Sequence, residues 1–473
     1  MIRQLLKDSV VYGVCSILSQ GISILIVPIY TRLLSPNEYG GMDILAVFAN
    51  LIILTVALEI SQGLARHYPE AQTATDRIAY ASTALWFSTV AYALFAVFSL
   101  TFSKPLTALL LTSPGWEETF RVAVIAITGN GIFFLLQNLL RWQLKPKGYA
   151  AASIAYVIIS TGIGVWLVAG FHMGVLGVFY GQLVGAVAGG FLAWFLAKDL
   201  YRFTFSREKC KEMIAFSVPL VPSSISILVA NYIDRFAIQS LMTLDDVGVY
   251  GVGFRFASVV NLLMVGFYGA LTPLIYQYYR KDSTSKELAR IFLYFFCGTL
   301  PLIVAVSLFS KEILWLLATP PYYAAWSVMP ILACASVMSR MYIFSPGLDI
   351  AKKTTTIALI NLSAALTNII LNFIMIPHLG IEGAAGATLI SAILTFAGYM
   401  ILSQRYYPVH HFWREIMAVT LVSAAAVITG IIFFNHSESF ETSRFVLKLI
   451  LLIGTALVTV WILLKRIDSM EKA

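Results

Sequence analysis

Runs of about twenty mostly apolar residues recur along the whole chain, and they constrain its fold more than any other feature. A helix of about 20 apolar residues is long enough to cross the hydrocarbon core of a membrane. Short connections with turn residues, such as Ser35-Pro36-Asn37, separate most of the runs. We therefore predict an all-α polytopic membrane protein with about fourteen transmembrane helices. The spans are expected near residues 10–30, 43–64, 78–101, 119–140, 149–169, 175–197, 214–240, 247–275, 288–310, 324–346, 355–376, 381–402, 414–434 and 445–464.

The composition excludes the main classes of soluble protein. Of the 473 residues, 59% are hydrophobic and 12% are charged, against about 25% charged in an ordinary soluble domain. A cytosolic enzyme, a secreted disulfide scaffold and a disordered regulator would each need more polar surface than this. The four cysteines lack the spacing of a metal or redox site, and His410-His411 has no further ligand at metal spacing. We expect no metal and no cofactor.

The distribution of positive charge predicts the orientation of the spans. If loops alternate between the two sides, 23 of the 32 lysines and arginines lie on the side of the N-terminus and six lie on the other. Cytoplasmic loops carry the excess of Lys and Arg in membrane proteins. Both termini are therefore expected in the cytoplasm. The net charge of +8 then reflects topology, and we expect no nucleic-acid partner.

The two halves of the chain resemble each other. Thr31-Arg32 recurs as Asp234-Arg235 at an offset of 203 residues, and Gly174 and Gly177 recur as Gly380 and Gly383 at an offset of 206. Collinear matches at a nearly constant offset indicate a duplication. Because each copy holds six spans, the copies insert the same way round, as two parallel six-helix bundles. The predicted domains are 1–197, a basic cytoplasmic linker 198–213, 214–403, and an extra helix pair with a tail at 404–473.

Three arginines lie inside the predicted spans: Arg235, Arg255 and Arg340. A charged side chain in the membrane is costly, so it usually faces a cavity or a partner. One interpretation is that these arginines hold an anionic substrate, because a guanidinium stays charged and its donors match phosphate oxygens. The other is that they snorkel to the interface or form an internal ion pair such as Asp234 with Arg255.

Acidic residues and prolines within the spans suggest coupling and bending. Glu59 lies in the second predicted span, where it either pairs with Arg66 or His67 or carries a coupling proton. Asp43 and Asp234 are further candidates for coupling. Proline removes an intrahelical hydrogen bond and permits a kink, so the hinge candidates are Pro219, Pro222 and Pro28.

Several segments, taken in order, resemble one known family. The turn from Tyr30 to Gly40, with the sequence YTRLLSPNEYG, resembles the opening of the O-antigen-type polysaccharide flippases of the MOP (multidrug/oligosaccharidyl-lipid/polysaccharide) exporter superfamily. The segment IDRF at 233–236, followed by VGVY at 247–250, resembles the start of their second half. GLARHY at 63–68 resembles the end of their second span, and LGIEGAA at 379–385 resembles the turn into their twelfth. The likeness covers essentially the whole chain.

The resemblance implies a fold and a function. It implies a MOP/MATE-like arrangement in a bacterial inner membrane, and a non-enzymatic protein that moves undecaprenyl-pyrophosphate-linked oligosaccharide across that membrane by alternating access. Related flippases use a cationic cavity and are coupled to a proton or sodium gradient. Arg235, at the Asp-Arg motif, is the first candidate for the cavity, and Arg32, its expected counterpart, is the second. Implied partners are the lipid-linked oligosaccharide, membrane lipids, a polysaccharide polymerase and a chain-length regulator.

Three alternatives stay open at this point. A lipid II flippase also has fourteen spans and a cationic cavity. A MATE-like drug exporter commonly has an acidic residue in its first span, and none lies between Val10 and Tyr30 here. A membrane-embedded glycan polymerase or glycosyltransferase usually has a large outer loop or an acidic metal-binding pair, and neither pattern is present.

Overall fold

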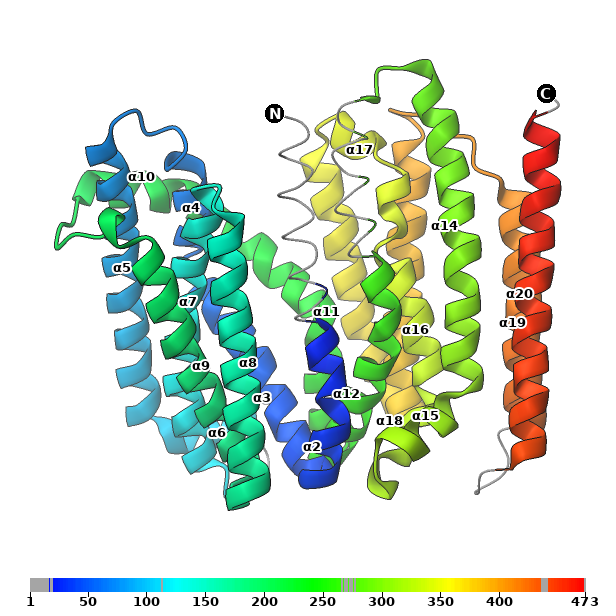
Figure 1. The fold of residues 1–473 in the computed structure, drawn as a ribbon, viewed down its shortest axis with the longest axis horizontal. Helices are drawn as coiled ribbons and strands as arrows, with labels where there is room; N and C mark the ends of the chain where they lie inside the picture. Colours follow the sequence, from blue (N-terminus) through cyan, green and yellow to red (C-terminus); the bar gives the residue numbers. More distant parts are fainter. Residues whose placement is uncertain are drawn as a thin grey trace. The chain divides into compact units, whose positions relative to one another are not determined.

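The computed structural model is built of helices throughout the residues that it describes, which are 17, 20–111, 114–264, 267, 271, 275, 278–434 and 441–471. Among them, eleven helices are long and apolar enough to cross a membrane. A pair of helices, Pro320–Ser327 and Met329–Phe344, is bent by 53° at the break between them. Counted as one membrane-spanning segment, this pair is the twelfth span. The predicted all-α polytopic fold is confirmed (Figure 1).

The fourteen predicted spans correspond to these helices. Two predicted spans, 355–376 and 381–402, form one 50-residue helix, α18 (Thr354–Ser403), whose backbone breaks at Gly380. The described part of the first span is the shorter apolar helix Gln20–Leu33, and the rest of that prediction lies outside the described residues. The bent pair, composed of η4 (Pro320–Ser327), α16 (Met329–Met338) and η5 (Met341–Phe344), occupies the predicted span 324–346.

The chain divides into two compact units, Met1–Gly248 and Val249–Ala473. The predicted domain boundaries stay a prediction, and the helices that follow the linker pack into the first unit. There, α10 (Arg207–Ser217) contacts α4 (Ile60–His67) and α5 (Ala74–Thr101), while α11 (Val221–Leu241) contacts α3 (Pro36–Thr55). The division falls inside α12 (Leu244–Ala257).

In the first unit, three long helices form the densest packing: α7 (Glu117–Trp142), α8 (Pro146–Phe171) and α9 (Gly174–Leu196). A buried core extends from these helices over α5 and α4 to Met213 of α10. The short helices α2 (Val27–Leu33) and α6 (Ser103–Leu110) and the turn η1 (Lys198–Leu200) complete the unit. Figure 1 shows α10 lying across the spans rather than along them.

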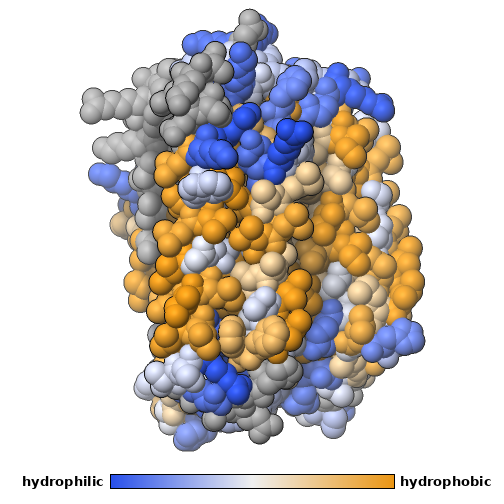
Figure 2. Space-filling view, turned by 90° about the vertical axis from the view of Figure 1, so that its right-hand side faces the viewer, coloured by the Kyte–Doolittle hydropathy of each residue, from blue (hydrophilic) through white to orange (hydrophobic). Residues whose placement is uncertain are grey.

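In the second unit, α14 (Asp282–Leu308) packs against α16, α19 (Trp413–Phe434) and α20 (Thr442–Glu471). This unit also has three short elements, which are α15 (Ser310–Leu317), α17 (Gly347–Ile350) and the turn η3 (Ser258–Val260). In the first unit, the turn η2 (Val218–Leu220) is equally short. Figure 2 shows an apolar band between two hydrophilic ends on the face of this unit that includes α20. Exposed Leu421, Ile432, Leu457 and Trp461 contribute to the apolar surface of α19 and α20, as expected for lipid-facing helices.

Local geometry supports the internal repeat. Gly174 and Gly380, paired in the sequence, have φ of +55° and +58°, a conformation that suits glycine. Each lies where one transmembrane helix turns into the next. The sequence match at an offset of 206 residues therefore reflects equivalent turns in the two copies.

The repeat register near Arg32 differs from the prediction. Ser35 and Glu38 form a capping box at the start of α3, and Thr243 and Asp246 exchange the same kinds of hydrogen bond at the start of α12. These matched caps set an offset of 208 residues, not 203. Since α2 and α11 run unbroken toward their caps, Arg32 is equivalent to Ser240 and not to Arg235.

Candidate functional site

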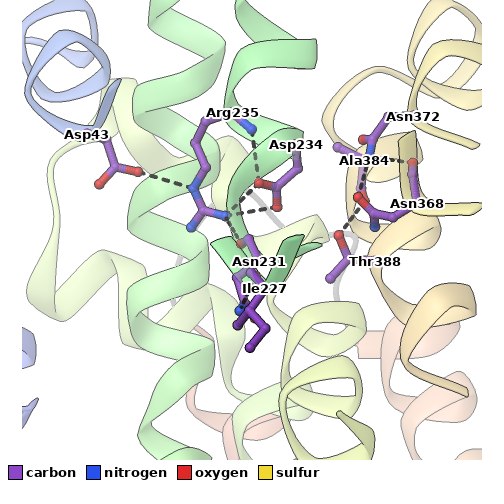
Figure 3. A network of polar contacts seen from close by, with 9 residues as sticks. All are labelled: Asp43, Ile227, Asn231, Asp234, Arg235, Asn368, Asn372, Ala384 and Thr388. Carbon is purple, nitrogen blue, oxygen red and sulfur yellow. Dashed lines mark hydrogen bonds and ion pairs between the residues drawn. The ribbon is translucent and has the colours of Figure 1, made fainter. Parts of the chain in front are cut away.

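A buried network of charges joins α3 and α11 in the first unit (Figure 3). Nη1 of Arg235 donates to both carboxylate oxygens of Asp234, at 2.7 and 2.9 Å, and Nε donates to Oδ2 of Asp43 at 3.4 Å. Arg235 is 2% exposed, and both aspartates are buried. The guanidinium also lies 5.3 Å from the centre of the Tyr232 ring.

Helical geometry explains why these side chains meet. Asp234 and Arg235 are neighbours on α11, where the carboxylate of Asp234 also accepts from the backbone N–H of Arg235 at 2.9 Å. The guanidinium reaches back one turn to the carbonyl oxygen of Asn231 at 3.4 Å. Asp43 comes from α3, two turns after the capping box that starts that helix. The packing of α3 on α11 therefore closes the network.

The balance of charge affects what this network can bind. One guanidinium faces two carboxylates, so the three side chains together carry a formal charge of −1. A pyrophosphate would have to compete with both carboxylates for Arg235.

The other predicted cationic residues have different surroundings. Arg255 lies on α12 and is half-buried. Arg32, at the end of α2, is exposed, and its Nη1 donates to the carbonyl oxygen of Pro28 at 2.7 Å. Arg340 is exposed at the break between α16 and η5. Their predicted role in substrate binding stays a prediction.

Glu59 lies in a break between two helices, not within a continuous span. Leu58 and Glu59 both have positive φ, +50° and +53°, and they separate α3 from α4. The Glu59 carboxylate is buried and accepts a hydrogen bond from the Ser224 hydroxyl at 2.6 Å. Neither expected partner pairs with it: Arg66 pairs with Glu70 at 2.5 Å, and the ring of His67 stacks on Tyr80. Sequence reasoning missed Ser224, because its distance along the chain carries no signal.

The break at Glu59 lies beside a second break that contains two of the predicted hinge prolines. Pro219 lies in η2 between α10 and α11, and Pro222 is the second residue of α11. On one side of the breaks α4 packs on α10, and on the other α3 packs on α11. The bond from Ser224 to Glu59 joins the two breaks. The third candidate, Pro28, is the second residue of α2, directly after an interruption at Ile26.

In the second unit, α18 carries a buried pair of asparagines that the sequence analysis did not select (Figure 3). Nδ2 of Asn372 donates to the carbonyl oxygen of Asn368 at 2.9 Å and to its Oδ1 at 3.0 Å. Nδ2 of Asn368 and Oδ1 of Asn372 have no hydrogen-bond partner in the described part of the chain. Their spacing of four residues within an apolar run was the available signal. Across the described residues, no three His, Cys, Asp or Glu side chains lie close enough together to hold a metal ion.

The family match covers just over half of the chain. A family model described as "Polysaccharide biosynthesis protein" matches residues 29–275. The chain belongs to the polysaccharide biosynthesis protein family. A second family model, MatE, matches residues 219–374 of the chain. Both copies of the internal repeat therefore have matches within the MOP exporter superfamily. The resemblance identified from the sequence is confirmed.

Two relatives of this polysaccharide biosynthesis family member are named for glycan biosynthesis and transport or flipping. The chain is 22% identical over 85% of its length to the "Probable low-salt glycan biosynthesis flippase Agl15" of Haloferax volcanii, of which it covers 83%. It is 23% identical over 66% of its length to the "Succinoglycan biosynthesis transport protein ExoT" of Rhizobium meliloti, of which it covers 62%. In fold, it is similar to the lipid II flippase MurJ, with a TM-score of 0.74 over 97% of this chain and 100% of the other, at 14% identity.

Proposed function

We propose that this protein is a flippase that moves undecaprenyl-pyrophosphate-linked oligosaccharide, such as an O-antigen repeat unit, across the bacterial inner membrane. The family match over residues 29–275 carries this proposal, and the names of the relatives favour a glycan flippase. The repeated halves suit alternating access, in which two similar bundles expose a site to each side in turn. Both termini would lie in the cytoplasm, and a polymerase and a chain-length regulator would receive the product.

The sequence relatives favour a polysaccharide substrate over lipid II. Two of them are named for succinoglycan and glycan biosynthesis, whereas the likeness to the lipid II flippase is one of fold at 14% identity. The drug-exporter alternative is disfavoured because these two relatives are named for glycan or succinoglycan biosynthesis. A glycan polymerase or glycosyltransferase is disfavoured because relatives are named as a flippase and a transport protein.

The substrate's pyrophosphate would meet the arginines that keep some exposure. Arg32 and Arg340 are exposed and Arg255 is half-buried, and a guanidinium binds phosphate oxygens in a bidentate manner. Arg235 is closed in by two carboxylates. We assign it, with Asp43 and Asp234, to ion coupling or to structural support of α3 and α11.

Coupling to a proton or sodium gradient would act through the buried carboxylates. Glu59 lies where two helix breaks meet, so a change in its charge would act directly on the bond between them. Pro219 and Pro222 would let α11 swing against α10 at this point. Asp43 and Asp234, the buried carboxylates that contact Arg235 between α3 and α11, form the second candidate position.

The first experiment tests the flipping of a glycan lipid. The purified protein is reconstituted into liposomes with undecaprenyl-pyrophosphate oligosaccharide, and a membrane-impermeant glycosidase reports the lipid in the outer leaflet. We expect protein-dependent equilibration, slowed by Arg255→Gln and unchanged in Arg66→Ala, whose exposed side chain pairs with Glu70. Equilibration no faster than in protein-free liposomes would refute the proposal. Equally fast movement of lipid II would refute the preference for polysaccharide.

The second experiment tests the role of Glu59. Glu59→Gln keeps an acceptor for the Ser224 hydroxyl but carries no titratable proton, whereas Ser224→Ala removes the hydroxyl and keeps the carboxylate. We expect Glu59→Gln to lose the dependence of flipping on the proton gradient, while Ser224→Ala retains it. Glu70→Gln, at an exposed position, is the matched control. An unchanged dependence in Glu59→Gln would place the coupling group elsewhere.

A further inference from the structure

The linker between the two repeats is fastened to α5 rather than lying free. Residues 198–206, here called the strap, cross α5 through four hydrogen bonds. Ser82 donates to the carbonyl oxygen of Leu200 at 3.2 Å and accepts from the backbone N–H of Arg202 at 2.9 Å. Thr83 accepts from the backbone N–H of Ser206 at 3.0 Å, and Trp86 donates to the carbonyl oxygen of Arg202 at 3.1 Å.

These anchors hold the strap in one position. The side chains of Ser82 and Thr83 are fully buried, so their hydrogen bonds are shielded from water. Ser206, the last residue of the strap, caps α10, and Met213 of that helix is packed against Gly63 of α4. Both ends of the strap are therefore fixed, and whatever it exposes is presented in a defined place.

The strap crosses α5 at the level of the membrane interface. Before Ser82, α5 carries the polar residues Thr75, Asp76 and Arg77, and after Thr83 it continues as an apolar run to Phe98. This change from polar to apolar marks where a spanning helix enters the membrane. Trp86, just past the change, is of the residue type that is enriched at that boundary.

Aromatic side chains of the strap are exposed at this level. Phe203 is 94% exposed and Phe205 is 55% exposed. The ring of Phe203 lies 5.2 Å from that of Trp86, so it extends the aromatic surface at the interface. A fixed, almost fully exposed phenylalanine is unfavourable in water, and burial among lipid headgroups and upper acyl chains would remove that cost.

Positive charges lie along the strap and beside its first residue. Lys198 and Arg202 of the strap are exposed, and Lys145 of the neighbouring turn donates through Nζ to the carbonyl oxygen of Leu196 at 3.4 Å. None of these three cations forms an ion pair with any residue that the structure describes, and Asp199 is the one acid within the strap. The Lys198 ammonium lies 5.0 Å from the centre of the Phe195 ring.

We propose that the strap is a binding site for anionic phospholipid headgroups of the inner leaflet. Phe203 and Phe205 insert at the interface, and Lys198, Arg202 and Lys145 bind the phosphates. A phospholipid fits better than a soluble anion, because the cations share the surface with exposed aromatic rings at the membrane boundary. The site would tie the connection between the repeats to the membrane surface. The inference does not depend on the transported substrate.

Lipid binding to the purified protein tests the site. Dioleoyl-phosphatidylglycerol is titrated in detergent and counted by native mass spectrometry, with phosphatidylcholine as the uncharged reference. Each basic residue near an anionic surface contributes about fivefold in binding, so we expect Lys198→Gln/Arg202→Gln to weaken phosphatidylglycerol binding about thirtyfold. Phosphatidylcholine binding should not change. Phe203→Ser should weaken both lipids alike.

A matched control removes the same charges elsewhere. Lys353→Gln/Arg405→Gln replaces an exposed lysine and an exposed arginine in the second unit and should bind phosphatidylglycerol like the wild type. An equal loss in this control would show that net charge alone governs binding and would refute the site. A third titration, with undecaprenyl pyrophosphate, separates the two lipid sources. If the strap variant loses only that lipid, the strap belongs to the substrate path and the assignment to phospholipid is wrong.

Discussion

Removing the guanidinium of Arg235 is expected to destabilise the protein, whatever that residue does in transport. In Arg235→Ala, the buried carboxylates of Asp43 and Asp234 lose the guanidinium that contacts both of them. Their side chains are 11% and 3% exposed, so water cannot replace the lost partner. Removing one member of a buried ion pair costs about 3–5 kcal/mol, which is more than a hundredfold in the folding equilibrium.

An exposed ion pair provides the control for this magnitude. Arg66 and Glu70 lie 2.5 Å apart, but their side chains are 54% and 55% exposed. Exposed pairs of this kind contribute about 0.3–0.5 kcal/mol, so Arg66→Ala should unfold nearly as the wild type does. Unfolding is followed by titration of the detergent-solubilised protein with sodium dodecyl sulfate. If Arg235→Ala and Arg66→Ala unfold at the same point, the reasoning from burial is refuted.

A neutral variant separates stability from transport. Asp43→Asn/Asp234→Asn/Arg235→Gln removes all three charges and keeps similar shapes and hydrogen-bonding groups. Replacing a whole buried ion network by neutral groups is often nearly neutral, so this variant should recover most of the lost stability. A stable variant that does not flip lipid would assign the charges to transport. A variant both stable and fully active would limit them to structural support.

Three further predictions follow from other parts of the structure. Burial among aromatic rings, with His410 adjacent, lowers the pKa of His411 from 6.5 to about 4. The unfolded chain therefore binds this proton first, and the free energy of unfolding should fall by about 2 kcal/mol from pH 7.5 to pH 5, a fall that His411→Phe should abolish. A Cβ at Gly248 would lie 2.0 Å from the carbonyl oxygen of Pro36, so Gly248→Ala should destabilise by about 1–3 kcal/mol, whereas Gly298→Ala, with open space around it, should not. Thr83→Val leaves the backbone N–H of Ser206 without its partner, which should destabilise the bound position of the strap by about 1 kcal/mol. Cleavage of the strap after Phe203 by chymotrypsin should therefore rise about fivefold. In the control Thr89→Val, the lost hydroxyl bonds only within its own helix, so this variant should be cleaved like the wild type.

Much of the architecture could be predicted from local signals. Apolar runs locate the spans because every spanning helix must satisfy its backbone internally and present apolar side chains to lipid. The turn at Pro377–Gly380 could be predicted because proline and glycine disfavour a continuous helix, and the structure breaks the helix at Gly380. The break at Leu58 and Glu59 carries no such signal. It depends on the packing of α3 and α4 against different partners.

The partners of the buried charges in the candidate site depend on tertiary packing. The sequence alone indicated that Arg235, Asp234, Asp43 and Glu59 are costly in a membrane and need partners. Only the tertiary structure decided which partners they have: Asp43, 192 residues away, for Arg235, and Ser224, 165 residues away, for Glu59.

The linker illustrates the same division. Its charge and turn residues predict a basic connection between two repeats, and the structure ties it to Ser82 and Thr83, more than a hundred residues earlier. In a membrane, both the lipid and the protein interior are apolar. Hydropathy therefore determines that a segment spans, but not which face packs against which helix. The spans and the duplication belong to the sequence, whereas the pairing of charges and the fixed strap arise from how the helices pack.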